Sequence, residues 1–195
     1  MRMLNHFKSY SARWKAYKEN LRETNKLKYW TVDWIETIAV CLVLVFIIRT
    51  YIVQTSVVFS SSMYPTMQIG DRLFVNKLIY RLSHPHRGDI VLFYSPFHDG
   101  RQYVKRLVAL PGEHVRIDKG VVSINGKPLF FPGVNVQPDY DYYAEVVVPK
   151  NAYFVLGDNR PNSADSRYWG FVPKSQLLGK AIFTFWPLPR MQMLH

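Results

Sequence analysis

An almost wholly apolar segment, residues 34–53, most constrains what this chain can fold into. It reads WIETIAVCLVLVFIIRTYIV. About 20 mainly apolar residues let a helix span a bilayer, and the charges of Glu36 and Arg49 near the ends can reach the headgroups. A buried core helix or strand is the alternative. Because a basic run precedes the segment and Trp30 and Trp34 lie where interfacial aromatics occur, we predict a single transmembrane helix.

The charge before this segment predicts its orientation. Residues 1–33 carry eight Lys/Arg against three Asp/Glu, whereas the whole chain has a net charge of +11. A basic segment can bind nucleic acid or an anionic membrane surface. The apolar segment that follows favours the lipid bilayer, and we expect no nucleic-acid partner. By the positive-inside rule, residues 1–33 are a basic cytoplasmic segment, 34–53 the anchor, and 54–195 a domain on the outer face of the cytoplasmic (inner) membrane.

A cleaved signal peptide is the remaining alternative for the apolar segment. It is disfavoured because the apolar core begins far from Met1 and no small-residue cleavage site follows it. The only cysteine, Cys41, lies inside the segment. The exported part therefore has no disulfide and depends on its core.

The exported part has the pattern of a β-rich domain. Short runs rich in Val, Ile, Phe and Tyr, separated by turn residues, are typical of strands. These runs are residues 71–80, 88–95, 103–110, 114–118, 120–125, 142–149 and 152–158. Asn125-Gly126 is a strong hairpin signal, and Pro111-Gly112 indicates a turn. We predict a mainly β fold: an antiparallel-sheet domain on one N-terminal transmembrane helix.

Three consecutive serines in FSSSMYPTM, residues 59–67, raise the prospect of a nucleophile. A serine needs a base within hydrogen-bonding reach. None of the histidines lies in a recognisable motif; they are His6, His84, His86, His98, His114 and His195. His84-Pro85-His86 could be half of a metal site, but nothing in the sequence completes it. We therefore expect no metal and no cofactor.

Lys105 is the other candidate base. It lies in YVKRLVALPGE, a strand pattern that should be half-buried. The alternative is an edge-strand lysine whose ammonium is in water. Burial and the neighbouring Arg106 would lower the pKa of Lys105 to about 8, which would allow it to act as a base. The residues alone leave open which serine would attack.

A third polar segment is GDNRPNSADSRYWGF, residues 157–171. A solvated surface loop is one interpretation. Because Tyr-Trp-Gly-Phe follows the polar residues directly, we favour a hydrogen-bonded loop that is folded against the edge of the core.

Four motifs together resemble the bacterial type I signal peptidases, or leader peptidases. SSSMYPTM, RGDIVLF, YVKRLVALPGE and GDNRPNSADSRYWGFVP occur in this order after the apolar segment. The resemblance implies a membrane-bound serine endopeptidase with a Ser-Lys dyad. Such an enzyme cleaves N-terminal signal peptides from exported preproteins, with small residues at the cleavage site. Its expected partners are those preproteins and the lipid bilayer.

The resemblance also assigns roles to individual residues. It makes Ser62 the nucleophile and Lys105 the base. Ser60 would join the Ser62 backbone N–H in an oxyanion hole, and Ser163 would hydrogen-bond the lysine. The structural ion pairs around the site would be formed by Asp158, Asp165, Arg106 and Arg167.

Three positions depart from the family pattern. Phe59 replaces a proline, Ser61 replaces a glycine, and Pro161 stands where an acidic residue is common. Ser61 is tolerable only if its φ is negative. These departures leave two alternatives open. One is a specialised maturation peptidase for a single exported precursor; the other is a non-catalytic, membrane-anchored binding module.

Overall fold

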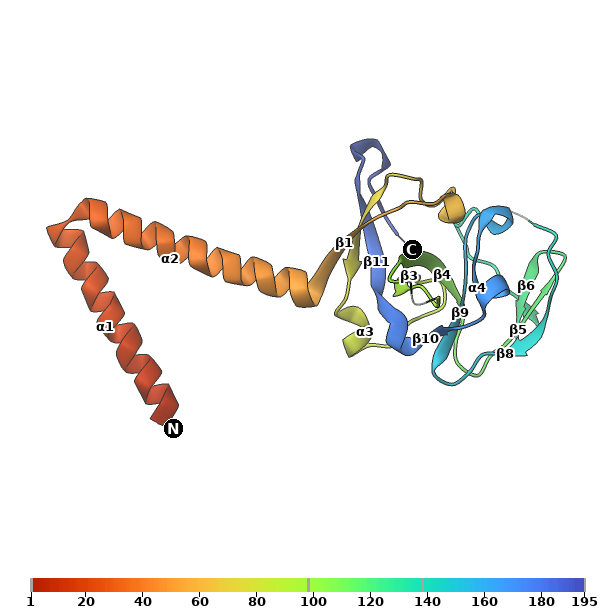
Figure 1. Cartoon of the computed structure of the whole chain (residues 1–195), viewed down its shortest axis with the longest axis horizontal. Helices are drawn as coiled ribbons and strands as arrows, with labels where there is room; N and C mark the ends of the chain where they lie inside the picture. The colour runs from red at the N-terminus through yellow and green to blue at the C-terminus, as the bar shows by residue number, and fades with distance from the viewer. Residues whose placement is uncertain (1, 98, 138, 195) are drawn as a thin grey trace. The chain divides into compact units, whose positions relative to one another are not determined.

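The chain divides into two units, Met1–Arg49 and Thr50–His195. Its structure is a computed structural model that describes residues 2–97, 99–137 and 139–194, with side chains from residue 12 onward. Figure 1 traces the helical first unit in red and orange and the β-rich second unit from yellow to blue.

The first unit consists of α1 (Arg2–Thr24) and α2 (Lys26–Ile47). Asn25 separates them and caps α2, because its side chain accepts a hydrogen bond of 3.1 Å from the Lys28 N–H. A π-helical turn, Ile48–Ile52, continues α2. The continuous helix Lys26–Ile52 is long and apolar enough to cross a membrane. It therefore begins eight residues before the predicted segment, and Val53 already belongs to the first strand.

The second unit is built on a large, mainly antiparallel sheet. Within the described residues its strand order is β1-β2-β11-β3-β4-β9-β10, and β12 pairs with β11. These strands are β1 (Val53–Val57), β2 (Arg72–Asn76), β3 (Ile90–Tyr94), β4 (Gln102–Ala109), β9 (Ala152–Leu156), β10 (Val172–Pro173), β11 (Leu177–Trp186) and β12 (Gln192–Met193). The paired strands are antiparallel, so the predicted fold class is confirmed.

A second, smaller sheet has the order β7-β6-β5-β8. Its strands are β5 (His114–Asp118), β6 (Val121–Ile124), β7 (Lys127–Pro128) and β8 (Tyr143–Val147). Asn125 and Gly126 connect β6 to β7 with φ values of +50° and +77°. Positive φ at both central residues is what a tight hairpin turn of this kind requires, so the predicted hairpin is confirmed.

The core of the second unit is divided by the large sheet. Because successive strand residues face opposite sides, Ile90 and Leu92 of β3 enter one cluster while Val91 and Phe93 enter another. A third cluster joins the large sheet to the small one. The helices of this unit among the described residues are short: α3 (Ile79–Leu82) and α4 (Ser166–Trp169). The segment predicted as a strand over 71–80 therefore ends at Asn76 and turns into α3.

Candidate active site

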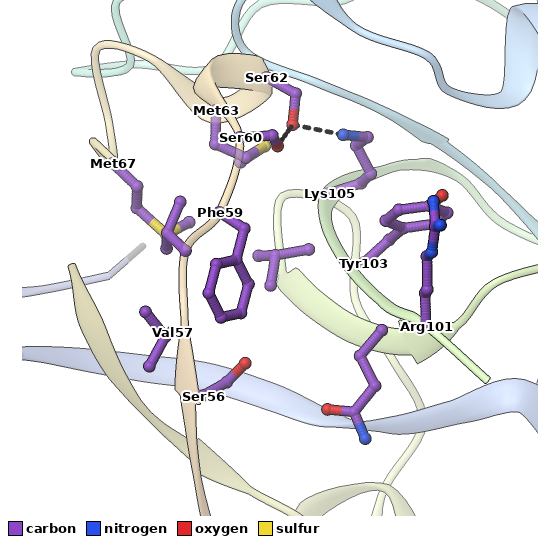
Figure 2. Close-up of a pocket in the computed structure, with 13 residues that line it drawn as sticks. Ser56, Val57, Phe59, Ser60, Ser62, Met63, Met67, Arg101, Tyr103 and Lys105 are labelled. Carbon is purple, nitrogen blue, oxygen red and sulfur yellow. Dashed lines mark hydrogen bonds between the residues drawn. The ribbon is translucent and has the colours of Figure 1, made fainter. Parts of the chain in front are cut away.

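A groove on the second unit brings the serine-rich segment beside β4. Residues 56–60, 62–63 and 67 form one wall and residues 101–105 the other, around a cavity of about 550 Å³. Figure 2 shows Ser62 and Lys105 at one end of this groove, with Ser56 near the other. At the far end, Gln54 Nε2 donates a hydrogen bond of 3.0 Å to Gln102 Oε1. The groove therefore runs between two extended backbone segments.

Ser62 and Lys105 are in direct contact, although the sequence separates them by 43 residues. Lys105 Nζ lies 2.5 Å from Ser62 Oγ (Figure 2). Ser62 lies in a 3-10 turn, Ser61–Met63, which packs Met63 into the core. Lys105 projects from β4. The exposed fractions of the two residues are only 6% and 3%, so the contact is almost completely removed from water.

Burial lowers the pKa of Lys105 to about 8. Desolvation, which disfavours the charged amine, is the main cause. The negative charges of Asp165 and Asp158 act in the opposite direction, and the positive charge of Arg167 reinforces the lowering. The direction and size of this pKa shift match the sequence-based expectation. The assisting charge is that of Arg167, which the sequence-based expectation did not include. Arg106, which that expectation named, is paired with Asp158.

The neighbouring serines have different surroundings. Ser60 Oγ lies 3.1 Å from Ser62 Oγ, as Figure 2 shows, so the two hydroxyls are hydrogen-bonded. Ser61 needs no glycine backbone, since among the described residues only Lys119 and Asn125 are non-glycine positions with positive φ. Phe59 is 84% exposed at the edge of the groove. The replacement of glycine by serine therefore introduces no backbone strain, and Phe59 adds an aromatic ring at the wall of the groove.

Arg106 and Asp158 form a buried bidentate ion pair. Arg106 Nε and Nη2 donate to Asp158 Oδ1 and Oδ2 at 2.8 and 2.7 Å. Thr66 Oγ1 donates to the same carboxylate at 2.6 Å, and Arg106 Nη1 donates to the Gly88 carbonyl. This carboxylate therefore ties β4 to both the 157–171 loop and the serine-rich segment 59–67.

Asp165 and Arg167 form a second cluster inside the 157–171 loop. Arg167 Nε donates to Asp165 Oδ1 at 2.9 Å, and the Gly157 N–H donates to Asp165 Oδ2 at 3.1 Å. Arg167 also pairs with Asp139 and Asp141, which precede β8. The loop is thus folded inward and hydrogen-bonded, as its sequence predicts.

Ser163 is buried beside the serine turn but does not bond the lysine. Its Oγ has no hydrogen-bond partner within the part of the chain that the structure describes. The expected hydrogen bond from Ser163 to Lys105 is therefore not formed here. A side chain at Gly157 would collide with Ser163 Oγ and with the Ser62 carbonyl oxygen. Gly157, Ser163 and Ser62 are consequently packed against one another without spare room.

Sequence reasoning missed Asn159, which holds the serine turn at two points. Its backbone N–H donates to the Ser62 carbonyl at 3.0 Å, and its side-chain Nδ2 donates to the Ser61 carbonyl at 3.0 Å. The only signal for this role was its place in the Gly-Asp-Asn-Arg run. Asp139 was also missed, because nothing near it in the sequence points to Arg167.

The histidines do not approach Ser62 where the structure describes them. His84 and His86 are exposed, and His114 Nδ1 pairs with Glu145 on the small sheet. His98 and His195 lie outside the described residues, as does the side chain of His6. Within those same described residues, no cluster of His, Cys, Asp or Glu could hold a metal ion.

Comparisons with known proteins point in one direction. A family model described as signal peptidase, peptidase S26, matches residues 31–186. The chain is 44% identical over 189 residues to a probable signal peptidase I-2 of Synechocystis, covering 90% of this chain and 85% of that protein. It is 37% identical to signal peptidase I T of Bacillus subtilis, covering 89% and 95% of the two chains.

A solved structure is also similar in sequence. It is a signal peptidase I from Enterococcus faecalis, 38% identical, covering 50% of this chain and 97% of that one with a TM-score of 0.43. The family match spans most of the chain and includes every residue of the Ser62–Lys105 site. This chain therefore belongs to the signal peptidase family, peptidase S26.

Proposed function

We propose that this chain is a signal peptidase I, a membrane-bound serine endopeptidase that cleaves N-terminal signal peptides from exported preproteins. The contact of 2.5 Å between Lys105 Nζ and Ser62 Oγ, both of them nearly buried at the end of the groove, carries the proposal. The names of the relatives, signal peptidase I, support the same activity. A serine beside an amine of lowered pKa is an activated nucleophile.

In the first chemical step, neutral Lys105 accepts the proton of Ser62 Oγ as that oxygen attacks the scissile carbonyl carbon. The resulting ammonium then donates a proton to the leaving amine when the peptide C–N bond breaks. This leaves an acyl ester on Ser62 and returns Lys105 to its neutral form. Lys105 can next deprotonate a water that hydrolyses the ester. A pKa near 8 suits both directions of proton transfer.

The oxyanion of the tetrahedral intermediate requires hydrogen-bond donors. Ser60 Oγ, 3.1 Å from Ser62 Oγ, and the Ser62 backbone N–H are the groups we assign to this role. Asn159 fixes the carbonyls of Ser61 and Ser62 and so keeps the turn in position. The ion pairs of Asp158, Asp165, Arg106 and Arg167 hold the 157–171 loop in place. Ser163 belongs to the same loop and is buried near Gly157 and the Ser62 carbonyl. Ser163 and these four charged residues support the site without touching the reacting atoms.

The groove suits an extended peptide. Segments 56–60 and 101–105 flank the cavity, so a substrate strand can lie between two backbones and form hydrogen bonds to them. Small residues next to the scissile bond fit because Ser62 and Lys105 are nearly buried. The exposed ring of Phe59 at the wall of the groove is placed to contact a bound peptide.

The helix Lys26–Ile52 supplies the anchor in this proposal. Residues 1–33 are then cytoplasmic, 34–53 lie in the cytoplasmic membrane, and 54–195 are the catalytic domain on its outer face. The eight Lys/Arg of the first 33 residues support this orientation.

The test is cleavage of purified precursors by the full chain in a neutral detergent. The substrates are a generic precursor with an Ala-x-Ala cleavage site and a panel of other exported precursors. Cleavage of the generic precursor at its signal-peptide junction is the expected result. Cleavage of only one precursor would indicate the specialised maturation peptidase, and cleavage of none would indicate the non-catalytic module.

A further inference from the structure

A second cavity of the β-rich unit lies apart from the Ser62 groove. It measures about 330 Å³, the liquid volume of roughly eleven water molecules at ~30 Å³ each. Leu177, Leu178 and the ring of Tyr80 form its apolar part, and Lys77, Arg81 and Lys174 provide its charges. It shares no lining residue with the groove. The proposed chemistry of Ser62 and Lys105 therefore does not account for this second cavity.

The charge of this cavity is one-sided. Among the described residues, no Asp or Glu is part of its lining. The nearest carboxylate along the chain, Asp89, is 6% exposed and already engaged: it pairs with Lys180 and accepts hydrogen bonds from the Tyr80 hydroxyl and the His86 N–H. Three cationic side chains beside apolar ones, without a carboxylate in the lining to balance them, are suited to bind an amphipathic anion.

The position of Lys77 links the cavity to the end of the apolar helix. Lys77 Nζ donates a hydrogen bond of 2.9 Å to the carbonyl of Thr50. Thr50 lies in the last turn of the helix Lys26–Ile52, the segment able to span a membrane. The next residue, Tyr51, has the guanidinium of Arg81 6.0 Å from the centroid of its ring. Basic and aromatic side chains at the end of a membrane span lie at the level of the lipid headgroups.

We propose that Lys77, Arg81 and Lys174 bind the phosphate headgroup of an anionic phospholipid, with Tyr80, Leu177 and Leu178 contacting its glycerol and upper acyl carbons. The ammonium of Lys77 keeps N–H donors beyond the one given to Thr50, because a lysine has three. Arg81 supplies a planar donor group that matches phosphate. The bound lipid holds the β-rich unit at the membrane surface. This site is independent of the Ser62–Lys105 chemistry, although it requires the proposed membrane anchor.

The experiment measures lipid binding to the full chain in a neutral detergent. Short-chain dihexanoyl phosphatidylglycerol is titrated at constant ionic strength, and the apparent Kd is taken from the rise in Tm of the β-rich unit. The test variant is Arg81→Gln with Lys174→Gln. The control variant is Lys119→Gln with Lys150→Gln, which removes the same charge at two exposed lysines outside the cavity. Each basic group near an anionic lipid contributes about five-fold to affinity, so the test variant should bind about 25-fold more weakly.

The lipid should raise the Tm of the parent and of the control variant over the same concentration range. The test variant should need far more lipid for the same rise in Tm. Dihexanoyl phosphatidylcholine, which adds a compensating cation, should raise Tm much less. Equal responses of the test and control variants would overturn the site. Inorganic phosphate that raises Tm as effectively as the lipid would overturn the lipid assignment and indicate a free-phosphate site.

Cleavage of a short soluble peptide in detergent should be the same in the parent and both variants. Peptide cleavage reports the Ser62 site, and the lipid-dependent rise in Tm reports the second cavity. Failure of the proposed peptidase and failure of the lipid proposal can therefore be told apart. Lys174→Gln alone, a change at an exposed side chain, should weaken lipid binding about five-fold and provides a variant with little risk to folding.

Discussion

Lys105 and Arg106 are adjacent in β4, yet each is committed to a different segment of the chain. Lys105 Nζ contacts Ser62 Oγ, while Arg106 is held by Asp158 in a bidentate pair. Successive side chains of a strand point to opposite faces, which makes this division of contacts feasible. The amine of Lys105 is thus removed from water beside a hydroxyl, whereas the guanidinium of Arg106 keeps a full counter-charge. The first can lose its proton near neutral pH, and the second cannot.

Substitution of the serines one at a time tests the role of each hydroxyl. Ser62→Ala should abolish precursor cleavage and leave the Tm close to that of the parent. Ser60→Ala should lower kcat by about 10²–10³, as loss of one oxyanion donor does, with little change in KM. Ser61→Ala is the matched control and should retain near-normal turnover, since the Ser61 side chain is exposed. An inactive Ser61→Ala with an active Ser62→Ala would show that the nucleophile is the neighbouring residue.

The pH dependence of cleavage should report the lowered pKa of Lys105. With a pKa of about 8, roughly a tenth of the amine is neutral at pH 7 and roughly nine tenths at pH 9. The parent kcat/KM should therefore rise about tenfold between these pH values. Lys105→Arg should be inactive at both, because arginine stays protonated. If Lys105→Arg cleaved at the parent rate with an unchanged pH profile, the base would have to be another group.

The same pKa has a consequence for stability. In the unfolded chain Lys105 has a pKa of about 10.5, so between pH 8 and pH 10.5 the unfolded state binds more protons and the free energy of unfolding rises with pH. Lys105→Met removes this titration. At pH 7 the variant should be inactive and more stable than the parent by up to about 3 kcal/mol, from 1.36 kcal/mol per pKa unit. Urea unfolding at pH 7 and pH 10 measures this gain, which should shrink at the higher pH; a gain of equal size at both would contradict the buried-amine explanation.

Gly157→Ala should disable the site without unfolding the domain. The added methyl group would meet the Ser62 carbonyl and Ser163 Oγ, so the serine turn must move. A displacement of about 1 Å at a reacting group can lower the rate about 10²-fold. Gly100→Ala is the comparison: its added methyl group meets open space, so its effect reports only the strain of a positive φ of +73° and no collision. Kinetics and Tm measured together decide the outcome: a loss of kcat confined to Gly157→Ala is expected, and normal turnover of that variant would disprove the tight packing.

Membrane orientation is tested by protease access. When a protease is added to spheroplasts, it should digest residues beyond Val53 and leave residues 1–33 intact, because the basic segment stays in the cytoplasm. Lysed spheroplasts serve as the control in which both regions are cut. Protection of the β-rich unit in intact spheroplasts would reverse the proposed orientation and exclude exported preproteins as substrates on that face.

Local signals predicted much of the fold. The turn residues Asn125-Gly126 fixed the β6–β7 hairpin, because few other residues adopt two successive positive φ values. β11, Leu177–Trp186, was not predicted, although it pairs with β2, β3 and β12. Its partners β2 and β3 come from distant parts of the chain, and Gly179 and Lys180 interrupt its apolar pattern. The short β10 was missed because its two residues carry no periodicity.

By itself, the sequence determined the apolar helix, the β-rich character of residues 54–195 and, through its motifs, the family and the residues worth testing. These depend on hydrophobicity, turn chemistry and motif order, which are local properties of the chain. Only the tertiary structure decided which charges surround Lys105, that Asn159 holds the serine turn, and that Ser163 Oγ finds no hydrogen-bond partner among the described residues. Desolvation and hydrogen bonding act between groups that folding brings together across long sequence separations. For the same reason, the basic cavity of Lys77, Arg81 and Lys174 exists only in the folded domain.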